Sequence, residues 1–337
     1  RKSHRKRKTH VDVLGDPVLP LKMPHQPGTF VYAPAVLSAC SYTRLTSNPC
    51  TDEGYEFENN FKPRCDDIII ATFPKTGNTL LSQLSHQIRR PGDSSYEDIY
   101  EVCPFLEFLW PLGVDDAENE SLRFNTFKPR IFKHHKYLSA CYQGGKYVCT
   151  FRDPVSAITS LYNMCIVSGY TKAKNVDEFV RDSNLLDEKW GWGANIFQYY
   201  VEQWKCRNCT NVLLLCFEDL VSDLRSHVYL LARFMNVSSP TERDLTKILR
   251  CCSRKYMIDH CTKFDESVTY DRMKRLGRWA SPFRPSSRVT SGEHHKSNQV
   301  SNELRSKLQE CWNRTMRKEF GFENYDALRR AIEELHK

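Results

Sequence analysis

Three short stretches of this chain combine cations, hydroxyl groups and an imidazole at positions suited to anion binding and proton removal. They are Phe73-Pro-Lys-Thr-Gly-Asn-Thr79, Lys133-His-His135, and Arg152 followed by Ser160. The first could cradle a phosphate, the second places a base beside a cation, and the third offers a second anion site. Each stretch follows an apolar run typical of a strand. We therefore expect all three to surround one cleft.

The first stretch has the order strand, loop, helix that an anion site requires. Unpaired backbone N–H groups at a helix start carry partial positive charge. Gly77 lets the backbone approach a ligand closely, and Lys75 adds a full charge. Further donors are the side chains of Thr76, Asn78 and Thr79. The lysine precedes the glycine, so this is not a Walker A loop. A plain strand–turn–helix corner, with Asn78 as the N-cap, remains an alternative.

The second anion site depends on two residues on consecutive elements. Arg152 ends a predicted strand, and Ser160 falls about two turns along the following predicted helix. Arginine offers a bidentate fork to a phosphate, and serine offers a hydroxyl donor. Alternatively, Arg152 pairs with Asp153 or another surface acid, and Ser160 is an ordinary helix residue.

The candidate base is His135. A neutral imidazole can take a proton from a hydroxyl or an amine, and the nearby Lys133 ammonium would favour this neutral form. His134 should point to the opposite side if the strand pattern continues. A structural role for the histidine remains open. A metal site built from His134, His135, His294 and His295 would lack carboxylate or cysteine support, so we predict no metal.

Four apolar runs predict the strands that position these residues: 67–73, 130–133, 146–151 and 211–217. Helical patterns follow them from Asn78, from Pro154 and from Leu224, and two more cover 302–319 and 324–335. This alternation predicts an α/β fold with a central parallel sheet. Ligands of such sheets bind beyond the carboxyl ends of the strands, where all three stretches lie.

Composition is that of a folded protein: 40% of the 337 residues are hydrophobic and 12% are aromatic. We predict a basic arm and irregular wrapping segment over 1–65 and a single domain over 66–337. The net charge of +8 is concentrated in the arm, which is either a solvated tail or a nucleic-acid patch. No run approaches the ~20 apolar residues of a membrane span. The 14 scattered cysteines indicate free thiols in a reducing compartment, hence a cytoplasmic location.

With these motifs in place, the chain resembles the cytosolic sulfotransferase family. That family's Tyr-Pro-Lys-[Ser/Thr]-Gly-Thr-Thr-Trp loop stands here as Phe73-Pro-Lys-Thr-Gly-Asn-Thr-Leu80, and its Lys-Thr-His as Lys133-His-His135. Its Arg-Asn-Pro-x-Asp-x-x-x-Ser stands as Arg152-Asp-Pro-Val-Ser-Ala-Ile-Thr-Ser160, and its Tyr-Glu-Asp-[Met/Leu] as Phe217-Glu-Asp-Leu220. The family's late Arg-Lys-Gly signature is best matched by Arg288-Val-Thr-Ser-Gly292.

The resemblance implies a three-layer, P-loop-like domain and an enzyme. Its reaction would move a sulfuryl group from 3′-phosphoadenosine-5′-phosphosulfate (PAPS) to a hydroxyl or amine of a small-molecule acceptor. Adenosine 3′,5′-bisphosphate (PAP) would be the product, and no metal would take part. The implied catalytic residues are His135 as general base, Lys75 and Lys133. The implied cofactor-binding residues are Lys75, Thr76, Gly77, Asn78, Thr79, Leu80, Arg152, Ser160, Phe217, Arg288, Val289 and Thr290.

The chain departs from the family pattern at the adenine site. Leu80 replaces the tryptophan that stacks on adenine, and Cys252-Ser253-Arg254 replaces the family's Thr-Ser-Phe. The family's C-terminal dimer motif is not recognisable over 296–303, so the oligomeric state is left open. Neither nucleic acid nor a membrane is expected as a partner.

The acceptor itself is not predicted. Family acceptor pockets are lined by loops, which here would lie around 100–110, 162–170 and 254–284. Their aromatic residues suit a flat or apolar acceptor, or else pack as a lid: Phe105, Phe108, Trp110, Tyr162 and Tyr170.

Three alternatives remain open. A Golgi membrane sulfotransferase would need an upstream membrane anchor, and the Lys133-His-His135 base fits the soluble family better. A nucleotide kinase of related fold would need a carboxylate for magnesium, and the available acids are Asp66, Asp67, Glu218 and Asp219. A non-catalytic nucleic-acid-binding protein would use the basic arm.

Overall fold

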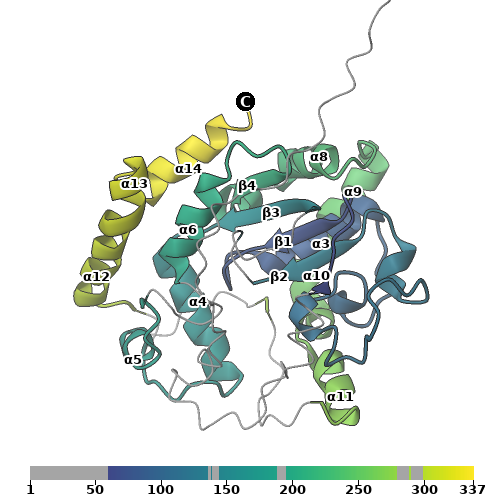
Figure 1. Ribbon diagram of the computed structural model, residues 1–337, viewed down its shortest axis with the longest axis horizontal. Helices are drawn as coiled ribbons and strands as arrows, with labels where there is room; N and C mark the ends of the chain where they lie inside the picture. Colours follow the sequence, from purple (N-terminus) through teal and green to yellow (C-terminus); the bar gives the residue numbers. More distant parts are fainter. Residues whose placement is uncertain (1–59, 136–137, 139–143, 188–194, 279–287, 290–298) are drawn as a thin grey trace, which may run out of the picture.

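The computed structural model describes residues 60–135, 138, 144–187, 195–278, 288–289 and 299–337 (Figure 1). A central sheet is flanked by helices on both of its faces, as the α/β prediction requires. Most of the predicted N-terminal arm lies outside the described residues, and so do Thr290, His294 and His295.

The sheet has four parallel strands in the order β2-β1-β3-β4. They are β1 (Ile68–Ala71), β2 (Ile131–His134), β3 (Lys146–Phe151) and β4 (Val212–Cys216). All four predicted strands are confirmed, with ends that differ by at most two residues. The apolar runs are continuous because every strand of a covered parallel sheet is buried on both faces.

Successive residues of β1 and β3 belong to two different cores. Ile69 and Cys149 face one core, whereas Ile68, Ile70 and Val148 face the other. The first core is covered by α4 (Pro154–Val167), α6 (Ile196–Lys205), α12 (Asn302–Trp312) and α14 (Tyr325–Glu334). The second is covered by α3 (Asn78–Arg89), α8 (Leu224–Phe234), α9 (Glu242–Cys251) and α10 (Arg254–Asp259).

Shorter helices complete the described part of the chain. They are α5 (Val176–Asp182), α7 (Phe217–Ser222), α11 (Ser267–Arg275) and single turns at Ile99–Glu101, Leu106–Phe108, Arg123–Thr126 and Cys261–Phe264. The helix predicted over 302–319 is α12, a π-helical turn at Asn313–Arg317 and α13 (Lys318–Phe320). The helix predicted over 324–335 is α14.

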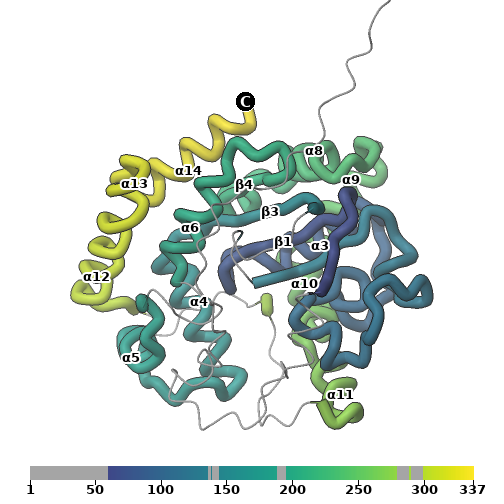
Figure 2. The backbone as a smooth tube through the Cα atoms, in the orientation of Figure 1, coloured from purple at the N-terminus to yellow at the C-terminus, as the bar shows by residue number. Residues whose placement is uncertain are grey.

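The connections of the sheet fix where a ligand can bind. After β1 the chain runs through α3 to β2, and after β3 it runs through α4 and α6 to β4, toward the other edge of the sheet (Figure 2). Because β1 and β3 are neighbours, the connections that follow them run toward opposite edges of the sheet from this point. Open α/β sheets bind ligands at such a switch point.

Within the described segments, no helix combines the length and the apolar character needed to cross a bilayer.

Candidate functional site

The loop after β1 holds two residues with positive φ angles. Gly77 has φ 121° and is the N-cap of α3, while Lys75 has φ 68°. The alternative with Asn78 as N-cap is wrong, because Asn78 is the first residue of the helix and no side chain caps the N-terminus. The first backbone N–H groups of α3 therefore lack intrahelical partners. A left-handed lysine is strained, and such strain is concentrated at functional sites.

Phe217 packs directly against this loop. A Cβ atom at Gly77 would lie 2.8 Å from Cδ2 of the Phe217 ring. The Arg152 guanidinium lies over the same ring, 4.5 Å from its centroid, and its Nη1 donates to the Lys75 carbonyl at 2.7 Å. Arg152 is thereby held beside the anion loop, at the end of β3. Its Nε is buried and has no partner among the described residues, so a donor is left for a ligand.

The other predicted cofactor residues lie at different depths. Thr76 is buried, and its hydroxyl donates to the Phe73 carbonyl at 2.7 Å, which ties it to the loop. Ser160 lies partly exposed on α4 and Thr79 partly exposed on α3. Leu80 packs against the second core, where the family has a tryptophan.

His135 follows β2 and is buried. Its Nδ1 lies 2.9 Å from the Thr72 carbonyl oxygen. Because a carbonyl only accepts, we assign the proton to Nδ1, which leaves Nε2 as the basic nitrogen. Its backbone N–H donates to the Glu107 carboxylate at 2.9 Å. Burial, and next the Lys133 ammonium, hold the pKa of His135 well below its usual value of 6.5, so the ring is neutral.

Asn78 connects the anion loop to this histidine. Its Nδ2 donates to the Thr72 hydroxyl and lies 3.3 Å from Nδ1 of His135. The start of α3 is therefore packed against the imidazole, and the loop and the base are parts of one site. Neighbouring His134 is fully buried in β2, with Nε2 3.9 Å from the Glu107 carboxylate.

Two lysines in the site are costly to charge. Burial, and next the nearby charges of Arg288, Arg152 and Lys133, together lower the pKa of Lys75 to about 7. Burial also lowers the pKa of Lys133. An anion bound among these cations would relieve their repulsion, which is the electrostatic property expected of a phosphate site.

Lys133 belongs to a buried hydrogen-bonded series. Its Nζ donates to the Tyr100 hydroxyl at 2.7 Å and lies 4.2 Å from the Phe105 ring centroid. The Tyr100 hydroxyl donates to Glu266 at 2.5 Å, and the second Glu266 oxygen is ion-paired with Arg288. Glu266 falls within the predicted acceptor loop around 254–284, but it lies in no motif that singles it out and is 166 residues from Tyr100.

Aromatic rings continue from the base toward α11. The Phe105 ring lies 5.2 Å from the His135 ring and 4.5 Å from Phe108, and Phe108 lies 6.4 Å from Tyr270. Tyr162 is different, because it is buried in the first core and donates to the Ala173 carbonyl at 3.2 Å. Of the aromatic residues predicted to line an acceptor pocket, Phe105 thus lies beside the base and Phe108 beside Phe105, whereas Tyr162 packs in the first core.

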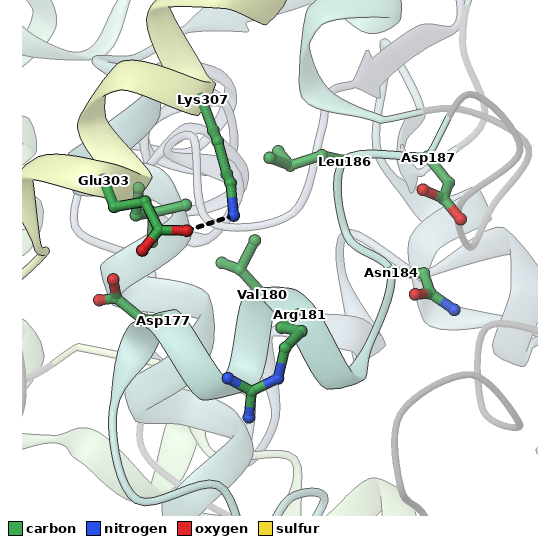
Figure 3. A pocket seen from close by; sticks show the side chains of 9 residues that line it. Asp177, Val180, Arg181, Asn184, Leu186, Asp187, Glu303 and Lys307 are labelled. Atoms are coloured by element: carbon green, nitrogen blue, oxygen red, sulfur yellow. Dashed lines mark hydrogen bonds and ion pairs between the residues drawn. The ribbon is translucent and has the colours of Figure 1, made fainter.

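A separate surface pocket of about 270 Å³ lies between α5 and α12 (Figure 3). Its charged wall includes the ion pair between Lys307 and Glu303, whose atoms are 2.7 Å apart. None of the predicted site residues lines it. It is lined by Asp177, Val180, Arg181, Asn184, Leu186, Asp187, Glu303, Leu304 and Lys307.

The carboxylates that a kinase would need for magnesium are engaged elsewhere. Glu218 accepts from the Asp153 backbone N–H at 3.0 Å and from the Tyr325 hydroxyl at 2.5 Å. Asp219 is ion-paired with Arg329. Asp67, which precedes β1, is ion-paired with the buried Arg130. These three acids are therefore already engaged by protein groups.

Comparison with known proteins identifies the family. The sulfotransferase domain model matches residues 65–336. The chain is 30% identical to sulfotransferase 1A1 of Rattus norvegicus, over 66% of this chain and 81% of the relative. It is 28% identical to sulfotransferase 4A1 of Homo sapiens, over 66% of this chain and 77% of the relative.

Solved structures share the fold. One is a retinol dehydratase in complex with androsterone and inactive cofactor PAP, with a TM-score of 0.59, 16% identity, and coverage of 81% of this chain and 88% of that one. Another is mouse sulfotransferase SULT7A1 complexed with PAP, with a TM-score of 0.56, 15% identity, and coverage of 84% and 93%. The predicted fold class, family and reaction class are confirmed, and this chain belongs to the sulfotransferase family.

Proposed function

We propose that this protein transfers a sulfuryl group from PAPS to a hydroxyl or amine of a small-molecule acceptor, with His135 as the general base. The observation that carries the proposal is the junction of the anion loop and the histidine. Asn78, the first residue of α3, lies 3.3 Å from His135 and shares Thr72 with it. A phosphosulfate on the loop would then lie close to the base.

The residues of the site fit such a donor. The Arg152 Nε has no described partner, and the guanidinium is held over Phe217 next to the loop. Arg152, with Ser160 further along α4, would hold the 3′-phosphate. The N-terminus of α3 and Lys75 would hold the 5′ end. The role of Arg288 and Val289 at the 3′-phosphate stays a prediction, and so does that of Thr290.

The donor supplies an activated sulfuryl group when it is bound. Nε2 of His135 would remove the proton of the acceptor hydroxyl or amine during attack on sulfur. Lys75, Lys133 and the loop N–H groups would stabilise the charge that grows on the departing 5′-phosphate oxygen. The aromatic rings of Phe105 and Phe108 would form a wall for the acceptor beside His135. No metal ion takes part in these steps.

The test is ligand-dependent thermal melting. PAP at 100 times its dissociation constant should stabilise the fold by about 2.7 kcal/mol, and ADP should have less effect. A positive result is followed by transfer of labelled sulfate from PAPS to a panel of phenols, alcohols and amines. Preference for ATP with magnesium would favour the kinase, and salt-sensitive DNA binding through the arm would favour the nucleic-acid-binding protein.

We also propose a cytoplasmic location. It is supported by the relative from Danio rerio named cytosolic sulfotransferase 1, which is 25% identical over 260 residues. The described cysteines, which are free thiols, agree with a reducing compartment. Fractionation of cells that express the tagged full-length protein tests this location. Recovery in a membrane pellet or in the medium would contradict it.

A further inference from the structure

Three buried side chains and the mostly buried Arg288, which are distant in sequence, form one connected series in the site. Lys133 at the end of β2 donates to Tyr100, and Tyr100 donates to Glu266. Glu266 also pairs with Arg288. Lys133, Tyr100 and Glu266 are each less than 7% exposed, at 6%, 6% and 4%, so water contributes little to their interactions. A buried carboxylate is costly unless it is paired, and Glu266 is paired both with Tyr100, the partner of Lys133, and with Arg288. Removing it would leave these groups buried without their partner.

The backbone at Glu266 is strained in a way that supports a dedicated role. Glu266 has φ 67°, in the left-handed region, and precedes α11 without capping it through its side chain. A non-glycine residue stays in this conformation only when its surroundings hold it there. One such contact is the Thr269 hydroxyl, which donates to Asp98 at 2.8 Å and fixes α11 against the turn that carries Tyr100. The carboxylate is thus held for Tyr100 and Arg288.

We propose that Glu266 is a positioning residue for sulfuryl transfer: acting through Tyr100, it holds the Lys133 ammonium in the nucleotide cleft. This inference rests on the proposed function. Glu266 itself does not need to touch the donor. Its second oxygen keeps Arg288 next to the same cations, so one carboxylate balances a cluster that would otherwise repel itself.

The charges around Lys133 give the inference a measurable consequence. The charged and titratable groups around it are Lys75, Tyr100, Cys103, Glu107, His135, Glu266 and Arg288. Among them Glu266 makes the largest contribution that raises the pKa of Lys133, and it also raises that of Lys75. Neutralising Glu266 should therefore lower both pKa values, and the free protein should hold fewer protons at neutral pH. Binding of PAP must then take up more protons from solution.

The experiment is calorimetric titration of full-length protein with PAP at pH 7, in buffers of different ionisation enthalpy. The slope of the observed heat against buffer enthalpy is the number of protons taken up. If the Lys75 pKa falls by the first half unit, proton uptake by Glu266→Gln should exceed that of the wild type by about 0.25, with smaller increments for further decreases. Tyr100→Phe, which removes the acceptor of Lys133, should also increase uptake and weaken PAP binding by roughly 10-fold.

Tyr96→Phe is the matched control. Tyr96 is fully buried, and its hydroxyl donates to Gln83 outside this series, so the variant should keep wild-type uptake and affinity. If Glu266→Gln fails to melt cooperatively, Tyr100→Phe decides. Wild-type proton uptake in a folded Tyr100→Phe that binds PAP would overturn this inference and leave the proposed function intact. Absence of PAP binding by the wild type would overturn both.

Discussion

At the scale of single residues, protonation decides what the site can do. His135 is neutral because it is buried beside Lys133, whereas Lys75, with a pKa lowered to about 7, loses its charge as pH rises. A deprotonated base and a protonated lysine therefore coexist on the acid side of neutrality. This is the combination that proton removal from an acceptor and binding of a phosphosulfate require.

The first prediction follows from the lowered pKa values of His135 and Lys75. Catalytic efficiency should stay level as pH falls through 6.5, because His135 stays neutral there, and should decline above about 7 as Lys75 deprotonates. Initial rates between about pH 5.5 and 9, with an acceptor from the screen, give the profile. An acid limb centred on the ordinary histidine pKa would show that the base is not the buried His135.

His135→Ala should lower turnover by on the order of 100-fold, because proton removal from the acceptor is lost. PAP affinity should be unchanged, since the imidazole does not bind the phosphates. Single-turnover rates and calorimetry measure the two effects. His227→Ala on α8, whose ring contacts the Asp223 carbonyl, is the control and should behave as wild type. Normal turnover in His135→Ala would remove the assignment of the base.

Gly77→Ala tests the close packing of the anion loop. The new Cβ would meet Phe217 at 2.8 Å in a backbone with φ +121°. We expect a loss of about 1–3 kcal/mol in the free energy of unfolding. The melting response to PAP should be lost with it. Gly169→Ala is the control, since φ is +77° there but no atom lies within 4 Å. That variant should keep its PAP response, and a retained response in both would argue against the loop as the phosphate site.

At the scale of secondary structure, the end of β4 ties the C-terminal helix to the site. The Glu218 carboxylate accepts hydrogen bonds from the Tyr325 hydroxyl of α14 and from the backbone N–H of Asp153, the residue after Arg152. The Phe217-Glu-Asp-Leu220 motif therefore has two uses. Its phenylalanine packs on the anion loop, and its carboxylates hold α4 and α14 in place.

Two substitutions on α14 compare the stabilising effect of the Tyr325–Glu218 hydrogen bond with that of the more exposed Arg329–Asp219 ion pair. Tyr325→Phe should destabilise the fold by about 1–2 kcal/mol, because it removes a hydrogen bond to a carboxylate at 2.5 Å. Arg329→Gln breaks a partly exposed ion pair with Asp219 and should cost less than about 1 kcal/mol. Chemical denaturation of both variants provides the comparison. Equal losses would mean that the tyrosine hydroxyl has no special role.

At the scale of the whole molecule, we keep the single domain over 66–337 as a proposal, together with a short preceding segment that packs on it. Phe61 is 7% exposed, and its ring lies 5.0 Å from that of Phe132 at the edge of the sheet. Arg64 is ion-paired with Glu118. The last part of the predicted wrapping segment thus contributes to the core.

Truncation measures this contribution. A chain that begins at Asn60 should have the same melting temperature as the full-length protein and the same stabilisation by PAP. A chain that begins at Asp66 loses Phe61 and should be less stable by about 3–5 kcal/mol, the usual cost of removing a buried phenylalanine. Calorimetric melting of the three chains is the measurement. Equal stability of both truncations would show that the segment before the domain adds nothing.

The four strands, their parallel arrangement and the loop of Lys75 and Gly77 at the end of β1 could be predicted from the sequence alone. These features depend on local apolar runs and on residue order, which a linear pattern records. The same holds for His135 and Arg152, because each directly follows a strand and parallel strands end at one edge of the sheet. The family resemblance rested on these motifs and was confirmed.

The distant side chains that complete the site could be identified only in the folded structure. Glu266 meets Tyr100 across 166 residues, and Asn78 meets His135 across 57. The structure also shows that Glu218 and Asp219 bind side chains of α14, and that Tyr162 is buried in the first core. Such contacts depend on how helices pack over the sheet and on burial, which sets the pKa of each group. The spacing of residues along the chain predicts neither this packing nor the burial of each group.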